Sequence, residues 1–562
     1  MSNSDRQRVV RNFLPVASNP RRGKEQFKDF VNNGNLYFST KESVSYGDGA
    51  LWESSQLRSV GRKAHGWFFI LSWAAAFSEL DEEDQSDLIF NFSRLIERWM
   101  EKSKDPKSMA FHDETTAQRV MNLCFVLDAF GSSLPRKIRQ LTDSIIENDL
   151  ELLNSESFYA GVNNHGMFQD MAILFAISYG RRSEEAERLE DFALSRLASY
   201  FSVSYTADGI HNENNPYYHM AISRHMKSVL DYANIVGKSH AFEGMQSVFE
   251  HADKYAAFSL TPGGHFPPIS DTIVRQISRI DATRSFGEGW LLGAVTRGDQ
   301  GKLPREKVFV AESSGYGICR TGWTNDSDTY VFFSSAYNAD YHKHADELSL
   351  YVYANGYEVI SESGTHGYER NHPFTQYAYS SFAHNTLIVD NQGLPRVERT
   401  KAHLTTLTDT GSNEDQLDVM GRTQRYAGVD WTRQLSATAN SDADEPIVVR
   451  DRIVAEDKHN YKILWHFGSE ISSTINGSVV ELFIRGSDKK IGELAWFGSD
   501  VVSVEKFRGV TEPNVQGWKF PRAGEAEEAD CLQFEFEGTS VFVEWQISLK
   551  DFLMRQPHAL LE

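Results

Sequence analysis

Four short segments of the sequence gather side chains that can transfer a proton, hydrogen-bond an anion or bind a metal. They are residues 163–166 (NNHG), 208–219 (DGIHNENNPYYH), 341–346 (YHKHAD) and 379–386 (YSSFAHNT). Any one of these residues can be purely structural, and an Asn at a helix start is most simply a cap. The density of polar groups in all four segments favours a functional site.

Proton transfer is the chemistry that the second segment indicates. Residues 208–219 form a predicted turn followed by a helix start, where Tyr218 stands beside His219. A tyrosine hydroxyl titrates near 10 when unperturbed, so Tyr218 needs a nearby positive charge to act near neutral pH. His342 and Arg370 are the candidate sources of that charge. The structural alternative is a polar loop whose aromatic rings cover the core.

Metal binding is the chemistry that the third and fourth segments indicate. Asn355-Gly356 predicts a tight hairpin turn, which brings Glu362 back toward the strand that follows His344. His384 enters the next strand and supplies a second imidazole. Two His and one carboxylate suit zinc or a similar divalent ion. We expect one such ion; manganese, or hydrogen bonds among the three side chains without an ion, are the alternatives.

A succession of helices must position the first two segments. In residues 88–99, apolar side chains fall at the spacing of one helix face. Similar patterns cover residues 66–79, 117–130, 137–153, 167–179, 184–201, 217–236 and 240–258. Many helices of this kind in succession predict helical hairpins packed around a ring or an arc.

Short strands must position the last two segments, because the period of the apolar residues changes after about residue 307. Runs rich in β-branched and aromatic residues cover 329–333, 348–354, 385–389, 446–450, 461–467, 479–484, 532–536 and 541–547. They predict two packed antiparallel sheets. We therefore expect a helical domain over residues 1–300 and a β domain over 301–562.

Composition limits the partners and the compartment. The chain of 562 residues has 57 Lys and Arg against 78 Asp and Glu, a formal net charge of −21. This charge argues against a nucleic-acid or membrane-surface binder. The longest apolar stretch, 67–77, is too short to span a bilayer. No secretory signal is recognisable, so the expected compartment is the cytoplasm, or the periplasm or exterior if an export signal has been removed. The oligomeric state is left open.

The motifs in their order and spacing resemble the heparinase II/III superfamily of polysaccharide lyases. The resemblance rests on Asn164-His165, on residues 208–219, on HKHAD at 342–346 and on AHNT at 383–386, and it covers roughly residues 155–470. It implies an incomplete α/α toroid followed by an antiparallel β-sandwich, with the active cleft between them.

The resemblance also implies a role for each motif residue. Asn164 would neutralise the substrate carboxylate with help from His165, and Tyr218 would be the acid/base tyrosine. His342 and Tyr379 would be cleft residues that share proton transfer. Further substrate contacts are expected from His211, Glu213, His219 and Arg370, and a buried structural metal from His344, Glu362 and His384.

Two departures from the family pattern stand out. The middle metal ligand is usually Asp, whereas Glu362 is one methylene longer. Relatives often carry Gln-Ser-Pro where this chain has Asn214-Asn215-Pro216, a change that we expect to tune substrate binding.

The expected activity is β-elimination on a uronic-acid-containing polysaccharide, which leaves an unsaturated uronate end. The substrate would be a glycosaminoglycan, alginate or an exopolysaccharide. One alternative is a glycoside hydrolase on an α/α toroid, with Asp208 and Glu213 as its carboxylates. The other is a glycan-binding protein without catalysis. A lyase makes an ultraviolet-absorbing product, a hydrolase a saturated reducing end, and a binder no product.

Overall fold

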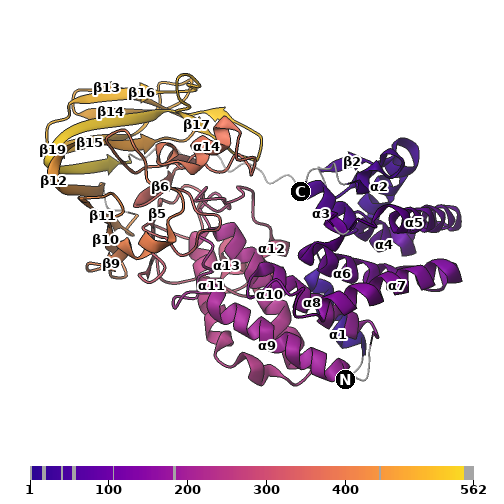
Figure 1. The fold of residues 1–562 in the computed structure, drawn as a ribbon. Helices are drawn as coiled ribbons and strands as arrows, with labels where there is room; N and C mark the ends of the chain where they lie inside the picture. Colours follow the sequence, from indigo (N-terminus) through magenta and orange to yellow (C-terminus); the bar gives the residue numbers. More distant parts are fainter. Residues whose placement is uncertain are drawn as a thin grey trace. The chain divides into compact units, whose positions relative to one another are not determined.

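The structure of the chain is a computed structural model, and it describes residues 3–14, 20–39, 42–53, 58–105, 107–181, 185–441 and 445–549. The chain divides into two compact units (Figure 1). The first comprises residues 1–204 and 225–245, and the second comprises 205–224 and 246–562. Within the described ranges, no helix combines the length and the apolar character that a membrane crossing demands.

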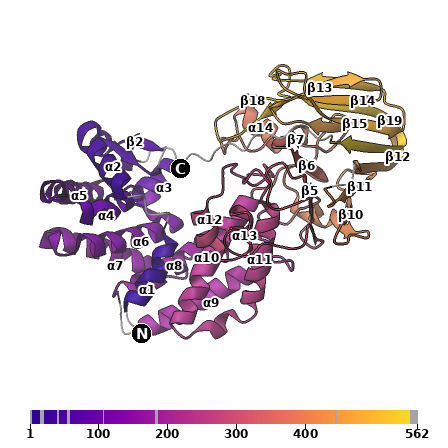
Figure 2. The same cartoon turned by 180° about the vertical axis from the view of Figure 1, so that it is seen from behind.

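The first unit is helical. Its helices are α1 (Asn3–Val10), α2 (Pro20–Asn33), α3 (Arg58–His65), α4 (Ile70–Ala76), α5 (Glu82–Lys102), α6 (Asp113–Phe130), α7 (Arg136–Leu153), α8 (Asn164–Ser178) and α9 (Ala186–Ser204). A small hairpin pairs β1 (Asn35–Tyr37) with β2 (Ser43–Ser45). Helix α4 packs on α2 and α6, and α8 packs on α6 and α9. Figure 2 shows α6, α7 and α8 side by side. The expected succession of paired helices is therefore present.

Apolar spacing explains why these helices form. Leu88, Phe92 and Trp99 share the buried face of α5, and the carboxylate of Asp81 caps its start by accepting from the Asp84 N–H at 2.9 Å. Helix α8 is buried on nearly all sides because it lies between α6 and α9. The helix start that carries Asn164 and His165 is thereby held by a rigid core.

A run of helices precedes the antiparallel sheets of the second unit. Helix α10 (Pro216–Ile235) begins in this unit and ends in the first, and α11 (Met245–Ser259), α12 (Arg279–Phe286) and α13 (Trp290–Val295) follow. The smaller sheet has the order β3-β4-β5-β6-β7. Its strands are Val308–Ala311, Tyr316–Arg320, Tyr330–Ser334, Ser349–Ala354 and Tyr357–Ile360.

Among the described residues, the larger sheet has ten strands. Its main path is β13-β14-β15-β19-β12-β11-β10-β9, with β16 on β19 and β8 on β12. In chain order the bounds from β8 to β16 are Leu387–Val389, Thr405–Asp409, Gln416–Thr423, Val429–Thr438, Ile447–His466, Ile471–Asn476, Val479–Ile484, Lys490–Gly498 and Ser503–Phe507; β19 is Cys531–Ser548. Helix α14 (Pro373–Tyr379) and the short pair β17 (Trp518–Lys519) and β18 (Glu527–Glu528) complete the unit.

The two sheets share one core, which makes this part of the unit a β-sandwich. Phe333 and Val352 of the smaller sheet belong to the same buried cluster as Val419, Leu435 and Trp545 of the larger one. The predicted order of helices followed by an antiparallel sandwich is confirmed. Helix α13 ends at Val295 and β3 begins at Val308, so the predicted boundary at 300 falls between them, although α11 to α13 cluster with the strands.

Four predicted strands proved to be two long ones. Residues 446–450 and 461–467 both lie in or next to β12, and 532–536 and 541–547 both lie in β19. The two strands pair antiparallel with a register shift between Val454 and His459. Residues 456–458 of β12 are exposed, so no inward apolar side chain marks the strand there. The sequence pattern breaks where the backbone pairing continues.

Candidate functional site

Tyr218 and His342 form the centre of the candidate site in the second unit. Tyr218 lies in the first turn of α10, and His342 lies in the segment between β5 and β6. Their ring centroids are 4.1 Å apart, and the rings are tilted by 37°. The structure thus brings together the predicted acid/base tyrosine and a residue predicted to share proton transfer.

Two carboxylates face the ring nitrogens of His342. Its Nδ1 lies 3.1 Å from Asp271 Oδ2, and its Nε2 lies 3.4 Å from Glu213 Oε2. Asp271 also contacts His344 Nε2 at 3.0 Å and accepts from Thr365 Oγ1 at 3.0 Å. Burial by itself raises the pKa of Asp271, but the hydrogen bonds from His342 and His344 outweigh it and lower the pKa below its usual range. Asp271 therefore stays charged and fixes the orientation of His342.

Asp271 was missed by the sequence analysis. It lies in an irregular segment between α11 and α12, next to Ser270 and Thr272. Its local signal is only a short polar run after two prolines, and its partners lie about seventy residues or more along the chain. Only the folded chain shows that this carboxylate joins the two histidines.

Asn214 holds the Tyr218 segment on the His342 loop. Its side chain is buried, donating to Ala339 O at 2.8 Å and Tyr341 O at 3.2 Å and accepting from Asn338 N at 2.9 Å. Asn215 caps α10, since its Oδ1 accepts from the Tyr218 N–H at 3.0 Å. The departure from the family pattern at these two positions thus serves the fold. The expectation that the departure tunes substrate binding stays a prediction.

His211 and His219 are core residues, with exposed fractions of 2% and 1%. His219 Nδ1 accepts from the His211 N–H at 3.0 Å, and its Nε2 lies 2.8 Å from Ala252 O. Burial lowers the pKa of His211 to about 3 and that of His219 to about 4, so both are neutral. Both nitrogens of His219 are used within the fold. Of the four expected substrate contacts, Glu213 faces His342 and Arg370 is exposed.

Asp208 is also engaged within the fold. Its Oδ2 accepts from Ser313 Oγ at 2.6 Å and from Ser314 N and Oγ at 2.9 Å each. This carboxylate anchors the turn before β4 to the segment that carries Tyr218. A hydrolase pair made of Asp208 and Glu213 therefore has no geometric support.

Tyr379 ends α14 and lies between a cation and a histidine. Its hydroxyl donates to Gly367 O at 3.1 Å, the guanidinium of Arg396 lies 4.2 Å from the ring centre, and the His344 ring is 5.1 Å away. Burial and the charge of Asp271 raise the pKa of Tyr379 to about 12, against the opposing charges of Arg396 and Arg370. Tyr379 is therefore better suited to donate a hydrogen bond than to act as a base.

The three predicted metal ligands are buried close together beside this site. His384 Nδ1 contacts Glu362 Oε2, and the His344 and His384 ring centroids are 5.3 Å apart. His344 Nδ1 is buried and has no hydrogen-bond partner among the described residues, while its Nε2 faces Asp271. The donor types and this orphaned nitrogen fit a divalent ion. The ligand atoms are nevertheless not gathered as closely as in a second group, in the first unit.

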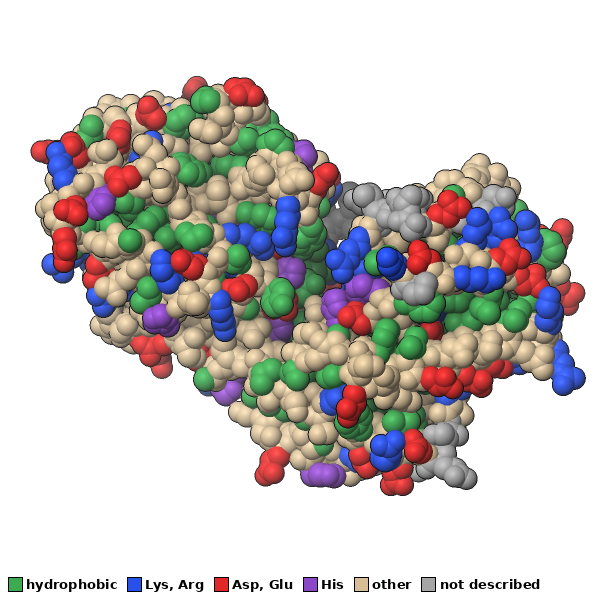
Figure 3. Space-filling view, in the orientation of Figure 1, with side chains coloured by type: hydrophobic (Ala, Val, Ile, Leu, Met, Phe, Trp, Pro, Cys, Tyr) green, Lys and Arg blue, Asp and Glu red, His purple; other side chains and the backbone are tan. Residues whose placement is uncertain are grey.

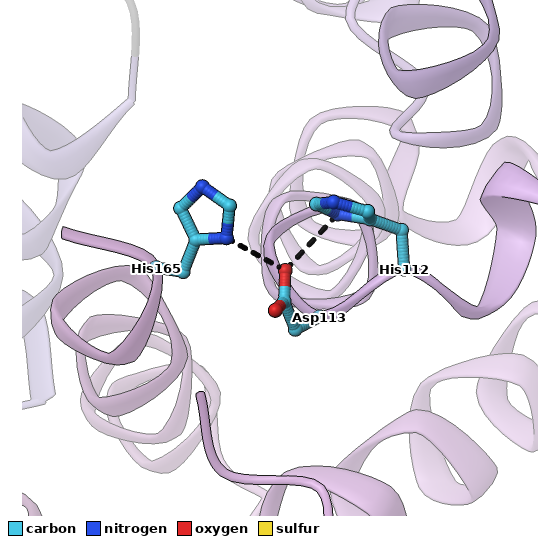
Figure 4. A group of neighbouring side chains, drawn as sticks. All are labelled: His112, Asp113 and His165. Carbon is cyan, nitrogen blue, oxygen red and sulfur yellow. Dashed lines mark hydrogen bonds and ion pairs between the residues drawn. The ribbon is translucent and has the colours of Figure 1, made fainter. Parts of the chain in front are cut away.

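That second group surrounds His165. Asn163 caps α8, because its Oδ1 accepts from the N–H groups of His165 at 2.9 Å and Gly166 at 3.1 Å. The cap therefore does not use Asn164, the first residue of the helix. His165 Nδ1 lies 2.9 Å from Asp113 Oδ1, and His112 approaches the same oxygen (Figure 4). Asn164 and His165 are thus parts of the first unit, whereas the other predicted site residues are parts of the second.

Two protein-family models match this chain. The model described as Heparinase II/III N-terminus matches residues 27–290, and the one described as Heparinase II/III-like, C-terminal, matches 303–552. A heparin-sulfate lyase of Pedobacter heparinus is 23% identical over 337 residues, which are 56% of this chain and 49% of that protein. The match thus spans about half of the curated relative.

Solved structures share the fold. A heparinase III structure has a TM-score of 0.78 at 14% identity and covers 95% of this chain and 85% of its own. The heparan sulfate lyase HepC of Pedobacter heparinus has a TM-score of 0.71 at 14% identity, covering 98% and 88%. A chondroitinase AC lyase has a TM-score of 0.54 at 10% identity, covering 97% and 83%. At these identities the likeness concerns the fold.

Proposed function

Because the chain belongs to the heparinase II/III-like family, we propose that it is a polysaccharide lyase that acts on a glycosaminoglycan. The observation that carries the proposal is the contact between Tyr218 and His342, with Asp271 and Glu213 at the two imidazole nitrogens. This arrangement supports the proposal, because the tyrosine ring packs against an imidazole that two carboxylates face.

The reaction is β-elimination at a uronate residue. A base removes the C5 proton, the electron pair forms the C4–C5 double bond, and the bond from C4 to the bridging oxygen breaks. A proton is then delivered to that leaving oxygen. We assign both proton transfers to Tyr218, with His342 as the alternative base. Asp271 positions the His342 ring through its contact with Nδ1.

The carboxylate of the uronate needs donors because negative charge develops on it as C5 loses its proton. We assign this role to the amide of Asn164, with His165 assisting. The support is the motif and the finding that Asn163, not Asn164, caps α8. The side chain of Asn164 is thereby not required for the helix start.

The substrate class follows from the relatives and remains part of the proposal. The curated relative is a heparin-sulfate lyase, and a chondroitinase AC lyase shares the fold. A net charge of −21 does not favour the binding of a polyanionic substrate. However, acidic and basic side chains are interspersed over the face seen in Figure 3. Exposed Arg370 and the nearby Arg396 supply cations beside Tyr379. We place sulfated glycosaminoglycans first, before alginate and bacterial exopolysaccharides.

A product assay tests the proposed function. Purified protein is incubated with heparin, heparan sulfate, chondroitin sulfate, hyaluronan and alginate, and ultraviolet absorbance is followed. We expect absorbance to rise with at least one of the glycosaminoglycans. New saturated reducing ends without absorbance would instead indicate a hydrolase, and binding without any product would indicate a glycan-binding protein.

We further propose that His344, Glu362 and His384 hold one divalent ion, with zinc as the first choice. Bound there, the ion would join the loop before β6, the end of β7 and the start of β8. The role of the ion would be structural, since metal binding adds to the folding free energy of the segments that supply its ligands. The buried His344 Nδ1 without a hydrogen-bond partner among the described residues supports the assignment.

A further inference from the structure

We propose that His112, Asp113 and His165 form a second divalent-metal site, located in the helical first unit. Among the residues that the structure describes, they form the one group of three or more His, Cys, Asp or Glu whose ligand atoms all lie within 4.8 Å of one another. The proposed elimination requires no ion at this place, and an ion held by His165 would leave Asn164 alone to neutralise the substrate carboxylate.

Two helix starts bring the three ligands together. His112 and Asp113 are at the beginning of α6, and His165 is in the first turn of α8 (Figure 4). Asp113 Oδ1 is 3.0 Å from His112 Nδ1 and 2.9 Å from His165 Nδ1. The two imidazole centroids are 5.4 Å apart. Because α6 and α8 pack on each other, this spacing is set by a helix–helix contact rather than by a loop.

Hydrogen bonds do not account for every potential ligand atom of this group. His112 Nδ1 is buried and has no hydrogen-bond partner among the described residues, although it lies 3.0 Å from the Asp113 carboxylate. A zinc ion bound at about 2.0–2.2 Å to such nitrogen and oxygen atoms holds neighbouring tetrahedral ligands about 3.3–3.5 Å apart. The two contacts of Asp113 Oδ1, at 3.0 Å and 2.9 Å, are within about half an ångström of that spacing.

The surrounding charges define what the ion would bind next. Glu114 pairs with Arg62 and lies 3.4 Å from His165 Nε2, where it can orient the imidazole from its far side. Arg58 contacts His112 Nε2 at 3.3 Å and must turn away when that nitrogen carries the proton, which its exposed position allows. The charges of the two carboxylates (Asp113 and Glu114) and of the two guanidinium groups (Arg58 and Arg62) sum to zero. A bound divalent ion therefore gives this cluster a net positive charge. Its open position then suits water or an anionic oxygen.

Cobalt titration of the chelator-treated full chain tests the site without any activity measurement. Co²⁺ bound by nitrogen and oxygen ligands is followed by its visible absorbance, in wild type and in Asp113→Asn. We expect Asp113→Asn to bind one Co²⁺ fewer per chain than wild type. Asp128→Asn, at the other end of α6, should bind the wild-type amount. Equal binding by Asp113→Asn and wild type would overturn the proposal.

A second variant separates this site from the one proposed in the sandwich. His344→Ala should retain one Co²⁺, and the double variant His344→Ala with Asp113→Asn should lose it. If His344→Ala does not fold, the comparison of wild type with Asp113→Asn still decides. Absence of lyase activity would contradict the proposed function and leave the cobalt result unaffected, so the two can fail separately.

Discussion

Two tyrosines lie in the first turn of helix α10, and they contact different partners. The hydroxyl of Tyr217 lies 3.5 Å from Arg275 Nη2, and the guanidinium of that arginine lies 5.2 Å from its ring. Tyr218 packs against His342 at 4.1 Å. The same residue type at adjacent positions therefore offers a matched test of which hydroxyl carries the chemistry.

We predict that Tyr218→Phe lowers the turnover number by about 10²–10⁴-fold, the usual cost of losing a general acid/base. The melting temperature and glycan binding should change little, because the ring that packs on His342 is retained. Tyr217→Phe is the control and should keep near wild-type turnover. Initial rates of ultraviolet absorbance measure both. A Tyr218→Phe rate within threefold of wild type would remove this residue from the mechanism.

Asn163 and Asn164 form a second matched pair at the start of α8. We predict that Asn164→Ala lowers the rate of elimination with little change in melting temperature. Asn163→Ala should instead lower the free energy of unfolding by about 1 kcal/mol, since it removes the cap. A thermal melt and an initial-rate assay of each variant distinguish the roles. A large stability loss in Asn164→Ala with full activity would reverse the assignment.

At the scale of elements, the segment 205–224 depends on contacts with the sandwich. Asn214 adopts φ = 58°, a region that Asn tolerates better than most residues, and makes three hydrogen bonds to residues 338–341. These bonds hold Glu213 and Tyr218 beside His342. Asn214 is thus a positioning residue for the site.

We predict that Asn214→Gly costs about 1–3 kcal/mol of stability, because buried groups of the 338–341 loop lose their partners. The turnover number should also fall, since the Tyr218–His342 contact loosens. Glycine accepts the positive φ without strain, so this variant isolates the hydrogen bonds. Asn214→Ala adds the backbone strain and should be less stable than Asn214→Gly. Urea unfolding and initial rates would check this, and unchanged values for Asn214→Gly would exclude a positioning role.

The proposed sandwich ion belongs to this scale too, because it would join three strand ends. We predict that protein purified without added metal carries tightly bound zinc, and that His344→Ala lowers both this content and the melting temperature. Elemental analysis and a thermal melt are the measurements. A chelator added to the native protein should have little effect, since all three ligands are buried. Zinc content near zero in a stable, active wild type would exclude the ion.

For the whole molecule, buried histidines determine how stability depends on acid. Burial lowers the pKa of five histidines to about 3 or 4, namely His65, His211, His219, His265 and His466. Buried carboxyl groups act the other way, because burial raises the pKa of Asp170 to about 7, that of Asp253 to about 6 and that of Asp149 above its usual range. The histidines outnumber these carboxyl groups, so we expect their effect on the pH dependence of stability to dominate.

We predict that the free energy of unfolding falls as pH is lowered from 7 to 5. A histidine that titrates near 6.5 when unfolded and near 3 or 4 when folded stabilises the fold above pH 6.5, and this contribution is lost as the pH drops. Each such group changes the stability by up to about 1.4 kcal/mol per pH unit. His65→Gln keeps an acceptor for Trp99 Nε1, which lies 3.1 Å from His65 Nδ1, and should show a smaller fall. Urea unfolding at both pH values measures it; stability that rises on acidification would contradict the prediction.

The sequence by itself determined the order of helices and strands, the Asn355-Gly356 turn and the family, which the comparisons confirm. These features depend on local periodicity, on positive φ at a turn and on short motifs, all of which are readable over a few residues. The sequence could also indicate that Tyr218 and His342 belong to one site, because both lie in recognisable motif segments.

Only the tertiary structure decided which polar residues face a site and which serve the fold. Asp271 meets two histidines about seventy residues away, while His211 and His219 are buried. Asn163 rather than Asn164 caps α8. The continuity of β12 and β19 through an exposed stretch was likewise hidden. In each case, the outcome depends on which residues from a distant part of the chain pack against the residue in question. Local sequence patterns do not contain that information.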